Sequence, residues 1–120
     1  MASLFGTNDS PLTIEVRQEK GATIVTTRGE VTVFSSAALR GTLRRAAEAR
    51  PPLLVLDLSG TLYIDSSGVA TIVEALQTVQ GYKGRLVLAG VTPRVRGTFE
   101  IVRLDRLFVM VGSVGEALAS

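Results

Sequence analysis

The sequence predicts a single α/β domain: a mixed, mostly parallel sheet of about five strands packed with about four helices. Three observations support this fold class. Short apolar runs typical of strands alternate with longer segments whose apolar residues recur at helical spacing. Gly or Pro lies at most of the joints between these segments. The length of 120 residues, of which 46% are hydrophobic, is that of one domain with a sizeable core.

The first elements are expected to form an antiparallel hairpin. Apolar and polar residues alternate over residues 12–17, which is the pattern of a half-buried strand. Residues 22–28 are rich in β-branched side chains and predict a second strand that ends at Gly29. A turn at residues 19–21 joins the two strands.

A helix and a central strand follow the hairpin. Ser35 or Ser36 can cap the helix. Its apolar face is formed by Leu39, Leu43, Ala46 and Ala47. Pro51-Pro52 prevents the helix from continuing. Residues 53–58 (LLVLDL) are almost all apolar, which predicts a central strand covered on both faces, and a turn at Ser59-Gly60 is expected to end it.

The second half of the chain continues the alternation of helices and strands. Apolar spacing after Gly68 predicts a helix that stops at Gly81. Residues 85–89 (RLVLA) predict another buried strand. Pro93 suits the first residue of a short third helix. The apolar face of that helix is expected to carry Val95, Phe99 and Val102. Residues 107–111 predict the last strand, and residues 113–119 predict a short C-terminal helix.

Composition excludes several classes of function. The chain has no Cys and no His, so it lacks a disulfide framework and the side chains of most catalytic triads and metal sites. Its net charge is only +2 and no long basic block is present, which argues against direct nucleic-acid binding. We therefore expect no enzyme activity, no cofactor and no metal.

The ends of the domain and its location are also predicted. Residues 1–11 are polar and mixed, which predicts a flexible N-terminal leader before a domain at residues 12–120. This leader lacks the basic and apolar regions of a signal peptide. The apolar runs are too short to span a bilayer, so we expect no membrane insertion and a cytoplasmic location.

The joint between the central strand and the next helix carries the segment IDSSGV, residues 64–69. Asp65 can act as the N-cap, with Ile64 and Val69 packed across it. Ser66 is then the first helical residue, and its hydroxyl is exposed. Free backbone N–H groups and the helix dipole would stabilise a phosphate there by ~0.3–1 kcal/mol. Asp-Ser-Ser is also ordinary helix-capping chemistry, so the motif has a purely structural explanation as well.

A longer pattern surrounds this motif. Residues 53–60 (LLVLDLSG) lead into residues 64–69, and together they resemble the signature of STAS domains: a strand ending in Asp-Leu-Ser, then a helix opened by Asp-Ser-Ser/Thr-Gly-Leu. Gly29-Glu30 matches the start of the family's Gly-Glu-Leu-Asp segment, and Thr32 stands at the place of its Asp. Residues 84–90 and 104–108 fit the family's later strand and helix end. The resemblance spans residues 12 to about 119.

The resemblance implies an anti-sigma factor antagonist that works by partner switching. In that family the unphosphorylated antagonist binds an anti-sigma factor that is itself a serine kinase, which frees the sigma factor. The kinase phosphorylates the Ser that follows the Asp, and a phosphatase reverses the reaction. Carried over, the phosphorylated residue is Ser66, with Ser67 as the second candidate. The implied partner surface comprises Glu30, Val31, Thr32, Phe34, Asp65, Ser66, Ser67, Gly68 and Val69. The protein is expected to be a monomer or a dimer.

Several alternatives remain open at this point. The chain also resembles the STAS subunits of lipid-transport ABC complexes, which act without phosphorylation, and the scaffolds of larger signalling assemblies. Phe34 either forms an apolar partner contact with Val31 or packs in the core. Tyr63 lies either on the surface or at the rim of the core.

Four arginines gather in the third predicted helix and the segment after it: Arg94, Arg96, Arg103 and Arg106. They could meet an acidic partner, a lipid headgroup or RNA. The alternative is a solvated face on which they are partly paired with Glu100 and Asp105.

Overall fold

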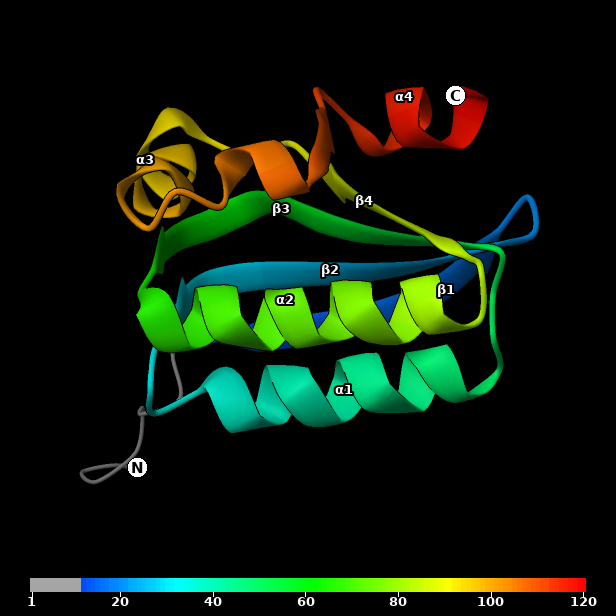
Figure 1. The fold of residues 1–120 in the computed structure, drawn as a ribbon, viewed down its shortest axis with the longest axis horizontal. Coiled ribbons are helices and arrows are strands. Elements are labelled where there is room, and N and C mark those ends of the chain that lie inside the picture. Colours follow the sequence, from blue (N-terminus) through cyan, green and yellow to red (C-terminus); the bar gives the residue numbers. More distant parts are fainter. Residues whose placement is uncertain (1–11) are drawn as a thin grey trace.

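The computed structural model describes residues 12–120, and the predicted leader at residues 1–11 lies outside them. The described part forms one α/β unit whose elements follow the predicted order (Figure 1). The strands are β1 (Thr13–Glu19), β2 (Ala22–Val31), β3 (Leu53–Ile64), β4 (Arg85–Ala89) and β5 (Val109–Val111). The helices are α1 (Ser36–Glu48), α2 (Ser66–Gly81), α3 (Pro93–Ile101), the 3-10 helix η1 (Asp105–Leu107) and α4 (Val114–Ala119).

The five strands form one mixed sheet in the order β1-β2-β3-β4-β5. β1 and β2 pair antiparallel, and every later pair is parallel. Lys20 (φ 53°) and Gly21 (φ 81°) form the tight hairpin turn, in the left-handed conformations that such turns need. Figure 1 shows α1 and α2 along one face of the sheet, with α3 and α4 on the opposite side. The predicted fold class is confirmed.

The core lies on both faces of the sheet, as the apolar run of the central strand predicts. Leu54, Val55 and Leu56 of β3 are all fully buried. Leu54 and Leu56 belong to the larger cluster, which includes side chains of α1 and α2. Val55 belongs to a smaller cluster that Ala117 of α4 completes. Because β3 is buried from both sides, it is the rigid element on which the residues after Ile64 depend.

Both central strands extend beyond their predicted ends. β2 continues past Gly29, and β3 continues through Ser59-Gly60, so the predicted turn there is wrong. The pairing of β2 with β3 contains two register shifts: one between Thr26 and Arg28, which pair with Asp57 and Gly60, and one between Gly29 and Glu30. Such an irregularity bends the strand without ending it. A glycine suits position 60 because a Cβ added there would lie only 2.8 Å from Cγ of Arg28.

The third helix and last strand also differ from their predictions. α3 begins at Pro93 as predicted, and Val95 and Phe99 are fully buried. Val102 follows the helix and is 37% exposed, so it does not belong to the buried face. β5 covers only Val109–Val111, because η1 occupies the residues before it. Phe108 instead packs edge-on against Phe99, with ring centroids 5.4 Å apart. Among residues 12–120, none of the helices has the length and apolar character needed to cross a bilayer.

We expect Gly68→Ala to destabilise the fold. The added Cβ would lie 2.6 Å from Cγ1 of Ile64 and 2.8 Å from Cγ1 of Val31, both in a packed core. Overpacking of this kind costs about 1–3 kcal/mol, which urea unfolding can measure. Gly97→Ala is the matched control, since that helical glycine has no atom within 4 Å of an added Cβ. The control should stabilise the fold by up to about 1 kcal/mol, and equal effects of the two changes would contradict this packing.

Candidate functional site

Two loops meet where the extended strands β2 and β3 end. Val31 pairs with Ile64, so the residues that follow these two positions start side by side. The backbone N–H of Asp65 donates to the carbonyl of Val31 over 3.0 Å, which continues the contact one residue beyond the sheet. The β2–α1 turn, residues 32–35, and the start of α2 are therefore neighbours in space, although they are distant in the sequence (Figure 1).

Asp65 caps α2, as predicted. Its Oδ1 accepts hydrogen bonds from the backbone N–H groups of Ser67 (3.0 Å) and Gly68 (3.1 Å). The same oxygen accepts the hydroxyl of Ser67 over 2.6 Å. Ile64 and Val69, on either side of the cap, are buried in one core cluster, which agrees with the predicted hydrophobic staple.

The second oxygen of Asp65 reaches the neighbouring loop. Oδ2 accepts the backbone N–H of Val33 over 3.0 Å, so one carboxylate joins the α2 N-terminus to the β2–α1 turn. Ser35 stabilises that turn from within: its hydroxyl accepts the N–H of Thr32 and donates to the carbonyl of Glu30. Ser35 occupies the predicted N-cap position of α1, but its hydroxyl caps none of the α1 amides.

The electrostatics of Asp65 follow from these contacts. Partial burial by itself raises the pKa of the carboxyl group. Hydrogen bonds from the Ser67 hydroxyl and from the N–H groups of Gly68, Val33 and Ser67 outweigh that effect and lower the pKa below its ordinary value of 3.8. Asp65 is therefore ionised at neutral pH, and its charge is held at the surface beside Ser66.

The two serines of the motif differ in availability. Ser66 is the first residue of α2 and is exposed, and its hydroxyl has no hydrogen-bond partner among residues 12–120. The hydroxyl of Ser67 is held by Asp65. One expectation needs correction: the N–H groups of Ser67 and Gly68 are not free to receive a phosphate, because Asp65 occupies both. A phosphate on Ser66 would meet an ionised carboxylate as well as the positive end of the helix dipole.

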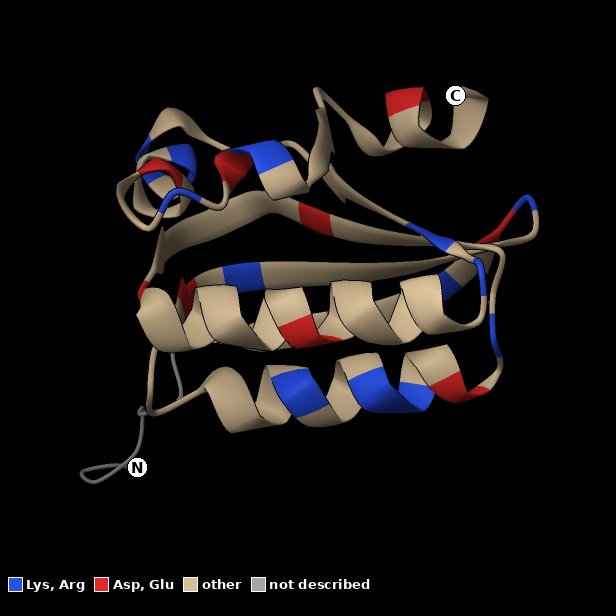
Figure 2. Ribbon diagram, in the orientation of Figure 1, with Lys and Arg blue, Asp and Glu red and all other residues tan. Residues whose placement is uncertain are grey.

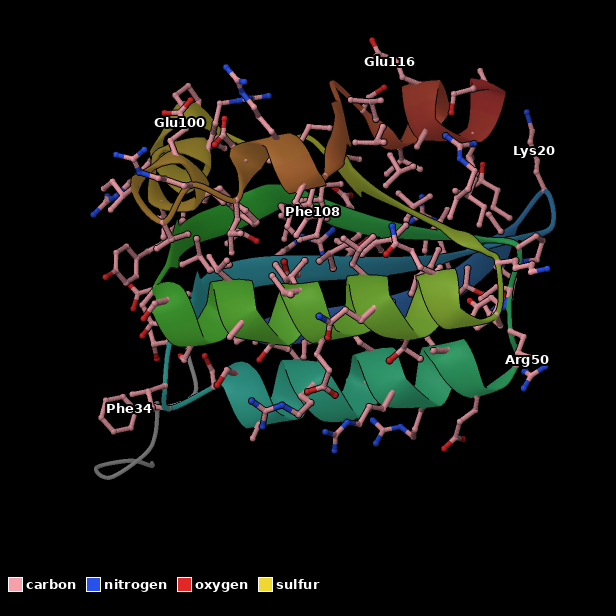
Figure 3. The ribbon with its side chains drawn as sticks, viewed as in Figure 1. Lys20, Phe34, Arg50, Glu100, Phe108 and Glu116 are labelled. Carbon is pink, nitrogen blue, oxygen red and sulfur yellow. The ribbon has the colours of Figure 1, made fainter. Side chains whose placement is uncertain are left out.

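Apolar side chains project beside this motif. Phe34 is 92% exposed, which corrects the expectation that it could pack in the core, and Figure 3 shows its ring pointing away from the ribbon. Val33 is 63% exposed and lies in the same turn. On the β3 side, Leu62 and Tyr63 are exposed as well. We call these four side chains the apolar rim: Val33, Phe34, Leu62 and Tyr63.

The implied partner surface contains both exposed and buried residues. Glu30, Phe34 and Ser66 are exposed, and Thr32, Asp65 and Ser67 are partly exposed. Val31, Gly68 and Val69 are buried in the core beneath the surface, so they cannot touch a partner directly. Val33 and Leu62 were missed by the sequence reasoning. Their only signal is that an apolar residue lies beside a strand end, and that pattern usually indicates core.

One of the four arginines predicted to gather on α3 and its exit contacts the apolar rim. The guanidinium of Arg94 lies over the ring of Tyr63, 5.6 Å from its centroid, which places Tyr63 on the surface. Figure 2 shows this basic region on α3 and the segment after it. The expected pairing with Glu100 and Asp105 is not found. Within residues 12–120, the ion pairs are confined to β1, β2, α1 and α2.

Residues 12–120 contain no group of three or more acidic side chains arranged to hold a metal ion. The surface at the ends of β2 and β3 thus offers a hydroxyl that no residue of 12–120 engages, a carboxylate held by hydrogen bonds from two loops, and an apolar rim. These are the components of a binding surface that a single modification can alter.

Comparisons with known proteins bear on the family and the fold. The family model described as STAS domain matches residues 13–117. An anti-sigma-F factor antagonist, RsfB from Mycobacterium tuberculosis, is 24% identical over 110 residues, which cover 89% of this chain and 87% of the relative.

Solved structures share the fold. An anti-sigma factor antagonist from Mycobacterium paratuberculosis superposes with a TM-score of 0.82 at 23% identity, over 90% of this chain and 92% of the other. A putative antagonist from Thermotoga maritima gives 0.82 at 18% identity, over 88% and 92%. The Bacillus protein SpoIIAA in its phosphorylated form gives 0.70 at 17% identity, over 89% and 97%.

Asp65→Asn should reduce both stability and its dependence on pH. The amide oxygen can still accept from α2, but the NH₂ group would face the N–H of Val33, so we expect a loss of about 1 kcal/mol at neutral pH. Because the native pKa of Asp65 is lowered, the unfolded chain binds more protons near pH 4 than the native protein does. The contribution of the carboxylate is complete above the unfolded pKa and is lost as pH falls through the native one.

The measurement is the urea midpoint as a function of pH for the wild type and the variant. Glu74 also has a lowered pKa, chiefly because of its hydrogen bond from Arg44, so part of the acid sensitivity persists in both proteins. The difference between the two curves should shrink on acidification. Parallel curves would contradict the assigned role of Asp65.

Proposed function

We propose that this chain, which belongs to the STAS domain family, is an anti-sigma factor antagonist that binds its partner through the surface around Ser66. Phosphorylation of the Ser66 hydroxyl releases that partner. The observation that carries the proposal is the exposed Ser66 hydroxyl at the α2 N-terminus, next to the ionised Asp65 and the exposed Phe34.

Charge provides the switch in this proposal. A phosphoserine adds about −1.5 to −2 charges at neutral pH. The net charge of the whole chain is only +2, so one phosphate nearly cancels it. The phosphate would also lie beside a negative charge that is already present, because Asp65 is ionised next to Ser66. A partner that buries Ser66 would have to desolvate the phosphate beside a carboxylate, which is unfavourable without a matching cation.

Apolar contact provides the affinity. Phe34 and Val33 leave most of their surface in water in the free protein, and burying a Phe side chain contributes about 1.5–3 kcal/mol. Asp65 holds the turn that carries them, so little ordering is required on binding. We infer a partner with an apolar pocket for Phe34 and a surface that tolerates a hydroxyl, but not a phosphate, at Ser66.

In this proposal Thr32 stabilises the turn that carries Phe34. It stands where the family has Asp, and its Oγ1 accepts the N–H of Phe34 over 3.2 Å. The hydroxyl therefore stabilises the turn without adding a second carboxylate beside Ser66. The partner kinase supplies the nucleotide and the catalysis, a phosphatase resets the hydroxyl, and this chain serves as a non-catalytic target in the cytoplasm.

The serine assignment is tested with the anti-sigma factor kinase of the same organism and ATP. Mass spectrometry should find phosphate on Ser66 in the wild type and in Ser67→Ala, and none in Ser66→Ala. Ser66→Asp should bind the kinase at least about tenfold more weakly than the wild type, because it places a second charge at the contact. Gln77→Glu adds the same charge on an exposed position of α2 and should bind normally.

Two results would contradict the assignment. One is phosphate on another residue in the wild type. The other is unchanged kinase binding by Ser66→Asp. Binding of a transporter ATPase in place of a kinase would favour the lipid-transport alternative.

Phe34→Ala tests the apolar contact. If Phe34 is an anchor, its loss should weaken anti-sigma factor binding about tenfold or more in calorimetry, with the fold unchanged since the side chain is exposed. Val109→Ala is the matched control, because Val109 is 51% exposed on β5, which is separated from β3 by β4. Equal affinity of the Phe34 variant and the control would exclude Phe34 from the interface.

A further inference from the structure

The sheet has a long open edge at β1. This strand has seven residues, and within the described part of the chain it pairs only with β2. One side of β1 therefore presents unpaired backbone N–H and C=O groups, which can pair with another strand. The opposite edge, β5, has only three residues and offers much less.

An apolar surface accompanies this edge. Val16 lies at the centre of β1 and is 50% exposed. Together with Ile14 it lines a groove of about 670 Å³ between β1 and α1, to which Ala46 and Ala49 contribute from the helix. A strand added to β1 would place side chains against the open side of this groove, because alternate residues of paired strands point to the same face.

The charged side chains of β1 indicate which strand can pair with it favourably. Glu15 and Arg17 flank Val16, and all three are exposed. An antiparallel copy of the same strand, related by a two-fold axis at Val16, would place Glu15 opposite the second copy's Arg17, and Arg17 opposite its Glu15. The same register pairs Thr13 with Glu19 and Ile14 with Gln18, so all seven residues are used. Opposite charges that face each other directly stabilise such a pair, and like charges destabilise it.

We propose that two copies of this chain associate through antiparallel pairing of β1 in the register centred on Val16. The backbone permits this register whichever way the N–H of Val16 points, because an antiparallel pair can be centred on a hydrogen-bonded or a non-hydrogen-bonded position. Glu15 already pairs with Arg28 (3.2 Å) and Arg17 with Glu19 (3.3 Å). In the dimer these exposed side chains join a network across the two-fold axis. No residue of the Ser66 surface lies on β1, so the proposal stands independently of the proposed function.

Charge reversal tests the register. In sedimentation velocity at submillimolar concentration, the wild type should have twice the 12.7 kDa mass of the chain. Glu15→Arg alone and Arg17→Glu alone place like charges opposite each other, and each should weaken dimerisation about tenfold or more. An equimolar mixture of the two variants should restore the dimer, because the arginine introduced into one chain then faces the glutamate introduced into the other across the axis. Glu100→Arg and Arg96→Glu, on exposed positions of α3, are the matched controls and should dimerise as the wild type does.

Three outcomes would overturn the proposal. The first is a monomeric wild type at every concentration. The second is a dimer that both single reversals leave unchanged. The third is a dimer that appears only after removal of residues 1–11, which would assign the edge to the chain's own N-terminal segment. Circular dichroism of each variant shows that a lost dimer is not a lost fold.

Discussion

The carboxylate of Asp65 is the interaction on which the candidate site depends. One oxygen caps α2, and the other holds the N–H of Val33 in a loop more than thirty residues earlier. The cap leaves Ser66 at the surface with a hydroxyl that no described residue engages, whereas the hydroxyl of Ser67 is bound by Asp65. The contact with Val33 fixes the turn that carries Phe34. The Ser66 hydroxyl and the exposed Phe34 are therefore both positioned by the Asp65 carboxylate, which also supplies the negative charge of the site.

This support requires the two central strands to end at the same level. Val31 and Ile64 are paired and buried, and Asp65 follows directly. β3 reaches that level only because its register shifts near Gly60 and the strand continues. Gly68 allows α2 to approach Val31 and Ile64 closely, since a Cβ added at Gly68 would collide with both side chains. The site is therefore a consequence of packing in the core as much as of the exposed motif.

Local patterns predicted most of the fold and the centre of the site. The order of elements, the Asp65 cap and the exposure of Ser66 follow from periodicity and capping chemistry, which act over a few residues. The continuation of β3 through Ser59-Gly60 could not be predicted, because a bulge depends on the partner strand. The exposure of Phe34 and the burial of Val31 depend on how two distant loops meet. That the α3 arginines form no ion pair with any residue of the described part of the chain likewise depends on side-chain placement in space.

The composition is compatible with the proposed modification of this surface by another protein. The sequence contains neither His nor Cys, and a target hydroxyl needs neither residue. The proposed switch requires that the hydroxyl is held in a fixed place at the surface. It also requires a small net charge of the chain, so that one phosphate changes that charge markedly.

Amide hydrogen exchange in Asp65→Ala tests most directly whether one carboxylate joins the two loops. The N–H groups of Val33 and Gly68 lie in different segments, and Asp65 accepts from both. Both amides should exchange faster in the variant, while amides in β4 keep their wild-type rates. Faster exchange at Gly68 with no change at Val33 would show instead that Asp65 is only a helix cap and does not join the two loops.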